Sequence, residues 1–422
     1  MNYYEENLSR LIRHFERGCK MDCFQKLGLE VEHFIVDKST GKSVSYYGER
    51  GVEAILREME GQYPHSYYEG DHLLGLYNSD YSLSLEPAAQ LEISVNPRGE
   101  ISHIRQIYRH FISQITPVLE SYGYRLVTRG YQPVSRAAEL PLIPKKRYAC
   151  MDDYFKTSGS RGLHMMRGTA SAQISIDYFS EEDCVRKMRA AYILGPAIKL
   201  LTDCTPVFEG QPAKGHLTRT AIWRDVDPKR CGICPGLFSE GFGFRSYAEY
   251  LMRLPLIFVP EAGGQDSYVR DRTAADIWKE EALSPGQVEH ILSMTFPDVR
   301  LKHYLELRAA DSMPFSHVCA YLALVKGIFF HEDALARILA APVGEKEILA
   351  AEDSLMEKGF AGEIYGMPAA EYCRMVVRMA KSHLRPDEQA LLEPMEQMIE
   401  ENSESGTAAI KEKRNLTQYY EE

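Results

Sequence analysis

The spacing of apolar residues changes along the chain and predicts a mixture of helices and strands. Apolar residues recur at helical spacing over residues 8–15, 51–59 and 101–119. Alternating or short apolar runs predict strands over residues 27–36, 81–95 (broken at Pro87), 124–130, 169–178 and 301–308. The chain is therefore expected to adopt an α+β fold.

The second half of the chain has a more helical pattern. Ser180, followed by three acidic residues, is a typical helix start, and this helix is expected to run to about residue 203. Residues 205–236 are rich in glycine, proline and charge and are expected to form a loop. From Phe315 onward the pattern is almost entirely helical, and residues 401–422 are expected to be loosely held.

Carboxylates recur on one face of the predicted strands. Side chains at positions i and i+2 of a strand point to the same side. The residues that share such a face are Glu30 with Glu32, Gln90 with Glu92 and Ser94, Gln173 with Ser175 and Asp177, and Glu306 with Arg308. Each strand alone also fits a sheet face that is exposed to water. The shared bias toward carboxylates, with an arginine on the last strand, favours a site.

If these faces converge, their acids must be neutralised. The carboxylates of Glu30, Glu32, Glu86, Glu92 and Glu306 would repel one another unless cations lay between them. Divalent ions with oxygen ligands suit such a cluster, and Mg²⁺ leaves coordination positions for substrate phosphates. Arg308 would then neutralise charge on a transferred phosphate. The sequence has no GxxxxGK[ST] motif, which argues against a Walker-type nucleotide site.

The charge balance and hydropathy exclude some partners. The chain has 49 Lys and Arg against 60 Asp and Glu, a net charge of −11, which argues against a nucleic-acid partner. The longest apolar stretch, residues 319–330, is interrupted by Lys326 and is shorter than the roughly 20 residues of a membrane span. The N-terminal residues do not resemble a secretory signal, so a cytoplasmic location is expected.

Nine cysteines are scattered along the chain without a framework. Cys231 and Cys234 form a CxxC motif, and Cys19 and Cys23 are spaced as on one helix face. Packed or exposed free thiols are the favoured interpretation for both pairs, and a redox or metal role is the alternative.

Seven segments, in order, give the chain a resemblance to the glutamate–cysteine ligase family of plants and many bacteria. These segments are GLEVEHF (28–34), SLEPAAQLEIS (84–94), RYACMDDY (147–154), HMMRGTASAQISIDYFSEED (164–183), TPVFEG (205–210), TRTAIWRDVDPKRCG (218–232) and FPDVRLKHYLELRAAD (296–311). The resemblance implies a glutamine-synthetase-like catalytic domain with a curved, mainly antiparallel sheet flanked by helices. The catalytic body would comprise residues 1–331, with a helical C-terminal extension over residues 332–422 packed on it.

The resemblance also implies a reaction. ATP would phosphorylate the side-chain carboxylate of L-glutamate to give γ-glutamyl phosphate. The amine of L-cysteine would attack this intermediate, release phosphate and form γ-glutamylcysteine, the first step of glutathione biosynthesis. The cofactors implied are ATP and Mg²⁺, with Mn²⁺ as the alternative metal.

Individual residues acquire roles from the same resemblance. The acids implied to hold metal are Glu30, Glu32, Glu86, Glu92 and Glu306. The residues implied to be catalytic are Arg308, which faces the transferred phosphate, Glu306 and Arg219, which meets anionic substrate groups. The residues implied to contact substrate or nucleotide are Gln173, Arg219, Trp223, Arg230 and Lys302.

Two departures from the family leave the acceptor open. The family often has glycine pairs where this chain has Ala88-Ala89 and Ser312-Met313. Glycine permits close backbone approach or positive φ angles, so its loss would reshape loops near the substrate. A ligase of the same fold that uses a different amine is therefore the alternative. A non-catalytic binding or regulatory paralogue is a third hypothesis, which the intact acid set disfavours.

Overall fold

The computed structural model describes residues 2–20, 24–260, 266–269 and 271–404. Its largest feature is a nine-stranded sheet with the order β14-β15-β7-β1-β5-β4-β3-β2, and β6 pairs with β1. These strands are β1 (Leu27–Asp37), β2 (His65–Glu69), β3 (His72–Tyr77), β4 (Tyr81–Leu85), β5 (Leu91–Arg98), β6 (Tyr124–Val127), β7 (Ala172–Ile176), β14 (Val299–Leu301) and β15 (Leu305–Leu307). All of their pairings are antiparallel, which confirms the predicted fold class.

One face of the sheet is apolar and fully buried. Leu29, Val31, Ile93, Ile174 and Leu307 expose at most 3% of their surface. Three long helices pack on the sheet: α3 (Ile101–Ser121) contacts β5, α11 (Phe315–Phe329) contacts β7, and α6 (Glu181–Leu201) contacts β14 and β15. Alternation along each strand then places the polar side chains on the opposite face.

The remaining helices surround this sheet. They are α1 (Tyr4–Glu16), α2 (Val52–Met59), α4 (Lys146–Ser158), α5 (Gly162–Gly168), α7 (Thr218–Arg224), α8 (Phe244–Arg253), α9 (Ala274–Ile277), α10 (Pro285–Leu292), α12 (Glu332–Leu339), α13 (Glu345–Lys358), α14 (Ala369–Lys381), α15 (Pro386–Gln389) and α16 (Glu393–Glu404). Short strand pairs are β8 (Val207–Phe208) with β9 (Gln211–Pro212), β10 (Cys231–Gly232) with β13 (Phe296–Pro297), β11 (Phe258–Pro260) with β12 (Asp266–Tyr268), and β16 (Glu363–Ile364) with β17 (Met367–Pro368).

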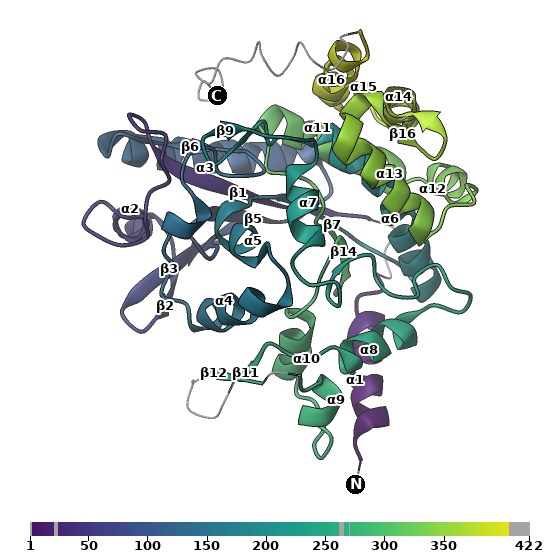
Figure 1. Cartoon of the computed structure of the whole chain (residues 1–422), viewed down its shortest axis with the longest axis horizontal. Coiled ribbons are helices and arrows are strands. Elements are labelled where there is room, and N and C mark those ends of the chain that lie inside the picture. Colours follow the sequence, from purple (N-terminus) through teal and green to yellow (C-terminus); the bar gives the residue numbers. More distant parts are fainter. Residues whose placement is uncertain (1, 21–23, 261–265, 270, 405–422) are drawn as a thin grey trace.

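The C-terminal helices form a separate group in space but share the main core. Figure 1 shows α12 to α16 gathered at the upper right, and α1, α8, α9 and α10 at the lower end. One cluster of buried apolar residues nevertheless runs from Leu8 to Ile399. The division of the chain at residue 331 stays a prediction.

Most predicted elements are confirmed, and the differences lie where the chain turns. The strand predicted over residues 301–308 is a hairpin of β14 and β15. The predicted loop over residues 205–236 contains α7. Residues 401–404 are the last residues of α16, and residues 405–422 lie outside the described part, so the expectation of a loosely held end stays a prediction. Cys19 lies beyond the end of α1, so the shared helix face is wrong for it, and Cys23 is not among the described residues.

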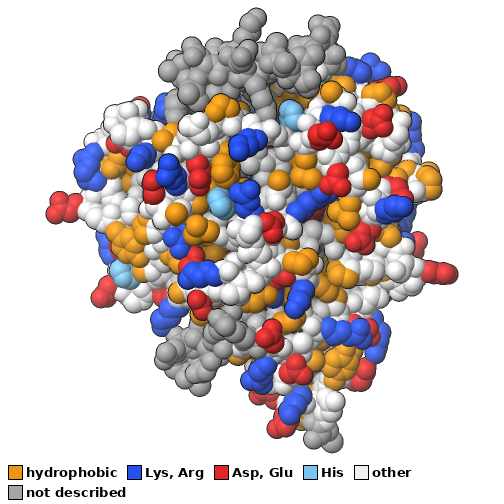
Figure 2. All heavy atoms as spheres, in the orientation of Figure 1, with side chains coloured by type: hydrophobic (Ala, Val, Ile, Leu, Met, Phe, Trp, Pro, Cys, Tyr) orange, Lys and Arg blue, Asp and Glu red, His pale blue; other side chains and the backbone are white. Residues whose placement is uncertain are grey.

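The surface carries mixed charge. Figure 2 shows Lys and Arg side chains interspersed with Asp and Glu over the face drawn. This differs from the basic stripe with which many proteins neutralise nucleic-acid phosphates. Within the described ranges, every helix is too short or too polar to cross a membrane.

Candidate active site

The strand register brings the predicted acids onto one face. In the β1–β5 pair, Glu32 lies opposite Glu92 and Glu30 lies opposite Ser94. In the β1–β7 pair, Glu30 lies opposite Gln173. Directly opposite residues of an antiparallel pair point to the same side of the sheet. The carboxylates of the two central strands are therefore neighbours, as the alternation predicted.

A cavity of about 650 Å³ lies over this polar face, and helices α4, α5, α7 and α10 contribute to its walls. Ten of the residues predicted to form the site line it: Glu30, Glu32, Glu86, Glu92, Gln173, Arg219, Trp223, Lys302, Glu306 and Arg308. The predicted convergence of acids from separate strands is thus confirmed. The cavity is large enough to hold small-molecule substrates.

Glu306 differs from the other acids because cations already surround it. Its side chain is fully buried, and its Oε2 accepts hydrogen bonds from Arg300 Nε at 2.7 Å and Arg308 Nη1 at 2.8 Å. Lys302 Nζ donates to its Oε1 at 3.0 Å. Although burial alone would raise the pKa of Glu306, these cations hold it well below its ordinary value. The geometry shows Glu306 as an anchor for Arg308, and its role as a metal ligand stays a prediction.

The acids of the central strands have the opposite electrostatics. Burial, followed by repulsion from Glu92 and Glu306, raises the pKa of Glu30 to about 8. Burial and the neighbouring Glu86 raise the pKa of Glu32 to about 7, and the pKa of Glu92 is raised to about 7 in the same way. The nearby cations do not offset burial and mutual repulsion at these three acids, and a divalent cation would supply the missing positive charge.

Gln173 connects the arginine to the acids. Its Oε1 accepts a hydrogen bond from Arg308 Nη1 at 2.6 Å, and its Nε2 donates to Ser171 Oγ at 3.2 Å. Ser171 in turn donates to both carboxylate oxygens of Glu32, from its backbone N at 2.8 Å and its Oγ at 2.7 Å. The orientations of Arg308 and Glu32 are therefore set by one polar network.

Helix α7 provides two buried donors. Arg219 exposes 7% of its surface, and its Nη1 donates to the main-chain oxygens of Arg308 at 3.1 Å and Ala309 at 3.3 Å. Among the described residues, Arg219 Nε and Trp223 Nε1 have no hydrogen-bond partner. Because unsatisfied buried donors are costly, these two groups are suited to an anionic substrate group such as a carboxylate.

The structure does not bring Arg230 to this cavity. Its side chain is fully buried, and its Nε donates to Asp227 Oδ2 at 2.6 Å. Its other nitrogens donate to Tyr154 Oη and to the main-chain oxygens of Met294 and Pro255. The predicted substrate contact is therefore not supported, because the guanidinium serves to hold neighbouring segments together.

Several cavity residues were missed in the sequence. Lys145 and Arg147 line the cavity near Glu86, and Arg300 contacts Glu306. Burial lowers the pKa of Lys145 despite its acidic neighbours. The basic run at residues 145–147 is a signal that could have marked the first two. Arg300 lies two residues before Lys302, the same i, i+2 spacing that revealed the acids.

One other group could be considered for a metal ion. His14, Glu289 and His303 have side-chain atoms within 4.8 Å of one another. The imidazoles of His14 and His303 lie with centroids 3.8 Å apart at an interplanar angle of 32°, and the Nε2 atom of each lies 3.7 Å from Glu289 Oε1. Cys231 and Cys234 are free thiols, and burial raises the pKa of both, which supports the interpretation of packed cysteines.

The turn before β5 holds Ala89 in a backbone conformation that favours glycine. Ala89 has a φ of 67°, which is the left-handed region, and its backbone N donates to the Glu86 oxygen at 2.9 Å. An alanine in this conformation costs about 1–2 kcal/mol. The chain therefore holds Glu86 at the cavity with a strained turn.

The variant Ala89→Gly should raise the free energy of unfolding by about 0.5–1 kcal/mol, because relief of strain exceeds the added chain entropy of glycine. Urea denaturation measures the change. The matched control is Ala88→Gly, whose residue is not among those with positive φ and which should be destabilising. Equal effects of the two substitutions would contradict the strain.

Comparisons with known proteins relate most of the chain to one family. A family model described as "Glutamate-cysteine ligase family 2(GCS2)" matches residues 26–422. The chloroplastic glutamate–cysteine ligase of Arabidopsis thaliana is 32% identical over 340 residues, covering 78% of this chain and 64% of that protein. The enzyme of Brassica juncea is 31% identical over 336 residues, with 78% and 65% covered. The chain thus spans 64–65% of the length of these relatives.

Solved structures share the fold at low sequence identity. A crystal structure of a glutamate–cysteine ligase from Francisella tularensis in complex with AMP has a TM-score of 0.54 and 10% identity, and covers 92% of this chain and 84% of that one. A bifunctional glutathione synthetase from Pasteurella multocida has a TM-score of 0.52 and 13% identity, with 98% and 52% covered. At this identity the two similarities show the fold.

Proposed function

The chain belongs to the glutamate–cysteine ligase family 2, and we propose from this that it is an ATP-dependent ligase. The reaction joins the γ-carboxylate of L-glutamate to the amine of L-cysteine through γ-glutamyl phosphate. The observation that carries the proposal is the convergence of Glu30, Glu32, Glu86 and Glu92 beside Arg308 in one cavity. Phosphoryl transfer needs such positioning and charge neutralisation more than a protein nucleophile.

The acidic cluster fits Mg²⁺, with Mn²⁺ as the alternative. The carboxylates of Glu32, which is buried, and of Glu30 and Glu92, which are half-buried, have acidic neighbours that raise their pKa values, and hard oxygen donors are the ligands that these ions prefer. Glu86 lines the same cavity and completes the donor set. When bound, the ion would neutralise the nucleotide's phosphates and polarise the transferred group.

The remaining residues would orient the reactants. Arg308 is held by Glu306 and Gln173 through its Nη1, which leaves the rest of its guanidinium for the transferred phosphate. The unpartnered donors of Arg219 and Trp223 would bind a carboxylate of the amino-acid substrate. Fixing the carboxylate and the phosphate within one cavity lowers the entropic cost of the reaction.

The direct test is to assay phosphate release with ATP, Mg²⁺, L-glutamate and L-cysteine and to identify the product by mass spectrometry. Phosphate release should require both amino acids and yield γ-glutamylcysteine. Glu32→Gln should lose this activity, while the surface variant Glu120→Gln should keep it, because Glu120 lies outside the acid cavity. ATP turnover that is unaffected by omitting glutamate would contradict the proposal.

A second candidate is a ligase of the same fold with another acceptor amine. It is favoured by the residues that replace the family's glycines, since Ser312 is buried and its Oγ donates to the main-chain oxygen of Glu32. A panel of amines in the phosphate-release assay decides between the two. Nucleotide binding without turnover of any amine would instead identify a non-catalytic paralogue.

The cytoplasmic location stays a prediction, for which cell fractionation is the test.

The acids of the cavity predict how stability depends on pH. Without divalent ions, the free energy of unfolding should fall as pH rises from 6 to 8.5. The pKa values of Glu30, Glu32 and Glu92 are about 7–8 in the folded chain against an ordinary value of 4.5. The folded state therefore retains protons that the unfolded state has released, and each pKa unit corresponds to about 1.4 kcal/mol.

Thermal denaturation in EDTA and in excess Mg²⁺, at several pH values, measures this effect. Added Mg²⁺ should raise the melting temperature most at the alkaline end, where the carboxylates are charged. Glu30→Gln should flatten the pH dependence in EDTA because it removes one of the perturbed groups. A stability that rises with pH in EDTA would contradict the assigned electrostatics.

A further inference from the structure

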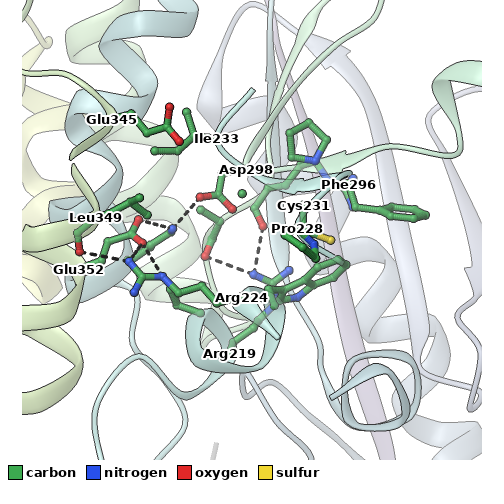
Figure 3. Close-up of a pocket in the computed structure, with 17 residues that line it drawn as sticks. Arg219, Arg224, Pro228, Cys231, Ile233, Phe296, Asp298, Glu345, Leu349 and Glu352 are labelled. Carbon is green, nitrogen blue, oxygen red and sulfur yellow. Dashed lines mark hydrogen bonds and ion pairs between the residues drawn. The ribbon is translucent and has the colours of Figure 1, made fainter. Parts of the chain in front are cut away.

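A second cavity of about 230 Å³ adjoins the acid cavity. The two share Arg219, Trp223, Phe296 and Arg308 as lining residues, so these side chains form the wall between them. Figure 3 shows this second cavity, with Arg219 and Arg224 from α7 on one side and Glu345, Leu349 and Glu352 from α13 on another. Helix α13 of the C-terminal region thus reaches the back of the wall shared with the acid cavity.

Glu352 is the centre of a buried ion network in this second cavity. It exposes 3% of its surface, and its Oε1 accepts a hydrogen bond from Lys199 Nζ at 2.5 Å. Its Oε2 accepts hydrogen bonds from Arg224, from Nη2 at 2.6 Å and from Nε at 3.2 Å. Lys199 Nζ also donates to Asp298 Oδ2 at 2.6 Å. One carboxylate therefore joins α13 to both α6 and α7.

Both branches of the network end beside residues of the acid cavity. The main-chain oxygen of Asp298 accepts a hydrogen bond from the backbone N of Arg308 at 2.9 Å. Arg224 lies on the same seven-residue helix as Arg219 and Trp223. A change at Glu352 would thus be transmitted to Arg308 through Lys199 and Asp298. Through Arg224 it would reach Arg219 and Trp223 on the same helix.

We propose that Glu352 of the C-terminal helical region is a positioning residue for the ligase reaction, which orients Arg308 and helix α7 from behind the wall shared by the two cavities. This inference rests on the proposed function. It gives the C-terminal region a role in catalysis without contact with substrate. It also predicts that the charge of Glu352, rather than its bulk, sets the catalytic rate.

The electrostatics of Lys199 agree with a network that must stay intact. Burial lowers the pKa of Lys199, but Asp298 and Glu352 more than offset this, and the pKa lies above its ordinary value. The ammonium therefore stays charged and needs both carboxylates. Removal of one partner from a buried ionic network leaves an uncompensated charge and weakens the connection between the segments that the network joins.

The test is the isosteric variant Glu352→Gln in the full chain, assayed for turnover well below its melting temperature. We expect kcat to fall at least about tenfold, with the KM for ATP changed less than about twofold, because the acids that would hold the metal–nucleotide lie on other elements. The matched control is Asp353→Asn, whose exposed carboxylate also pairs with Arg224 but does not contact Lys199. This control should keep wild-type kcat.

A spectroscopic measurement separates positioning from a purely structural role. The chain has two tryptophans, so Trp223 is the only one left in a Trp278→Phe background. In that background, Glu352→Gln should shift the emission of Trp223 or its quenching by acrylamide, and Asp353→Asn should not. If Glu352→Gln does not fold, the double variant Lys199→Met/Glu352→Gln, which removes both buried charges, takes its place and should show the same loss of kcat.

The outcomes are distinct. Wild-type kcat in folded Glu352→Gln, or a loss of activity that only follows loss of folded protein, overturns the positioning role while the proposed function stands. A wild-type chain that turns over no amine with ATP overturns the proposed function and the positioning role with it. A selective fall in kcat together with the change in Trp223 fluorescence supports both.

Discussion

Replacement of Arg308 by lysine should lower kcat at least about 100-fold while the chain stays folded. Arg308 donates from Nη1 to Gln173 at 2.6 Å and to Glu306 at 2.8 Å, and its planar fork can at the same time offer other N–H groups to a phosphate. A lysine ammonium is a single compact charge that cannot span these partners. Loss of one preorganised donor at a developing charge typically costs 10²–10³ in rate.

Steady-state kinetics with ATP, glutamate and cysteine measure this effect, and circular dichroism confirms that the variant is folded. The matched control is Arg98→Lys, because Arg98 also pairs with a carboxylate, that of Asp80, but lies outside the cavity. The control should keep its activity. Turnover of Arg308→Lys within a few-fold of wild type would show that Arg308 does not bind the transferred phosphate.

The face of each strand could be predicted from sequence because side-chain direction depends only on position within the strand. Glu30 and Glu32 must share a side whatever strands pair with β1. The partners themselves could not be predicted, since register depends on the whole sheet. The opposition of Glu32 to Glu92 is therefore a product of tertiary structure.

The surroundings of Glu306 show where local pattern fails. Residues 301–308 alternate like one strand, yet the chain reverses between β14 and β15. This hairpin places Arg300 directly opposite Glu306. A single extended strand would have kept Arg300 away from Glu306, so the ion pairs that neutralise this acid were not foreseen.

Basic residues were the least predictable part of the site. Arg219 and Arg230 both follow from the same family segment, but only Arg219 reaches the cavity. Arg230 instead pairs with Asp227, three residues earlier in the chain. The partner of a long cationic side chain depends on tertiary packing. The role of Glu352 likewise depends on the contact between α13 and α7, where Glu352 pairs with Arg224.

The variant Glu306→Gln should reduce turnover at least about 10³-fold and also lower the free energy of unfolding by about 3–5 kcal/mol. The fully buried carboxylate balances Arg300, Lys302 and Arg308, so the amide would leave these cations without a counter-charge. Arg308 would lose the carboxylate that accepts its hydrogen bond. The electrostatic potential at the neighbouring acids of the cavity would become more positive. Kinetics and urea denaturation measure the two effects.

The double variant Arg300→Met/Glu306→Gln separates stability from catalysis in the same cluster. It removes one of the cations that Glu306→Gln leaves unbalanced, so it should recover part of the stability. Its activity should stay low, because Arg308 still lacks the carboxylate that accepts its hydrogen bond at 2.8 Å. Recovery of activity in step with stability would mean that Glu306 only holds the fold together, and its assignment as a catalytic residue would then be wrong.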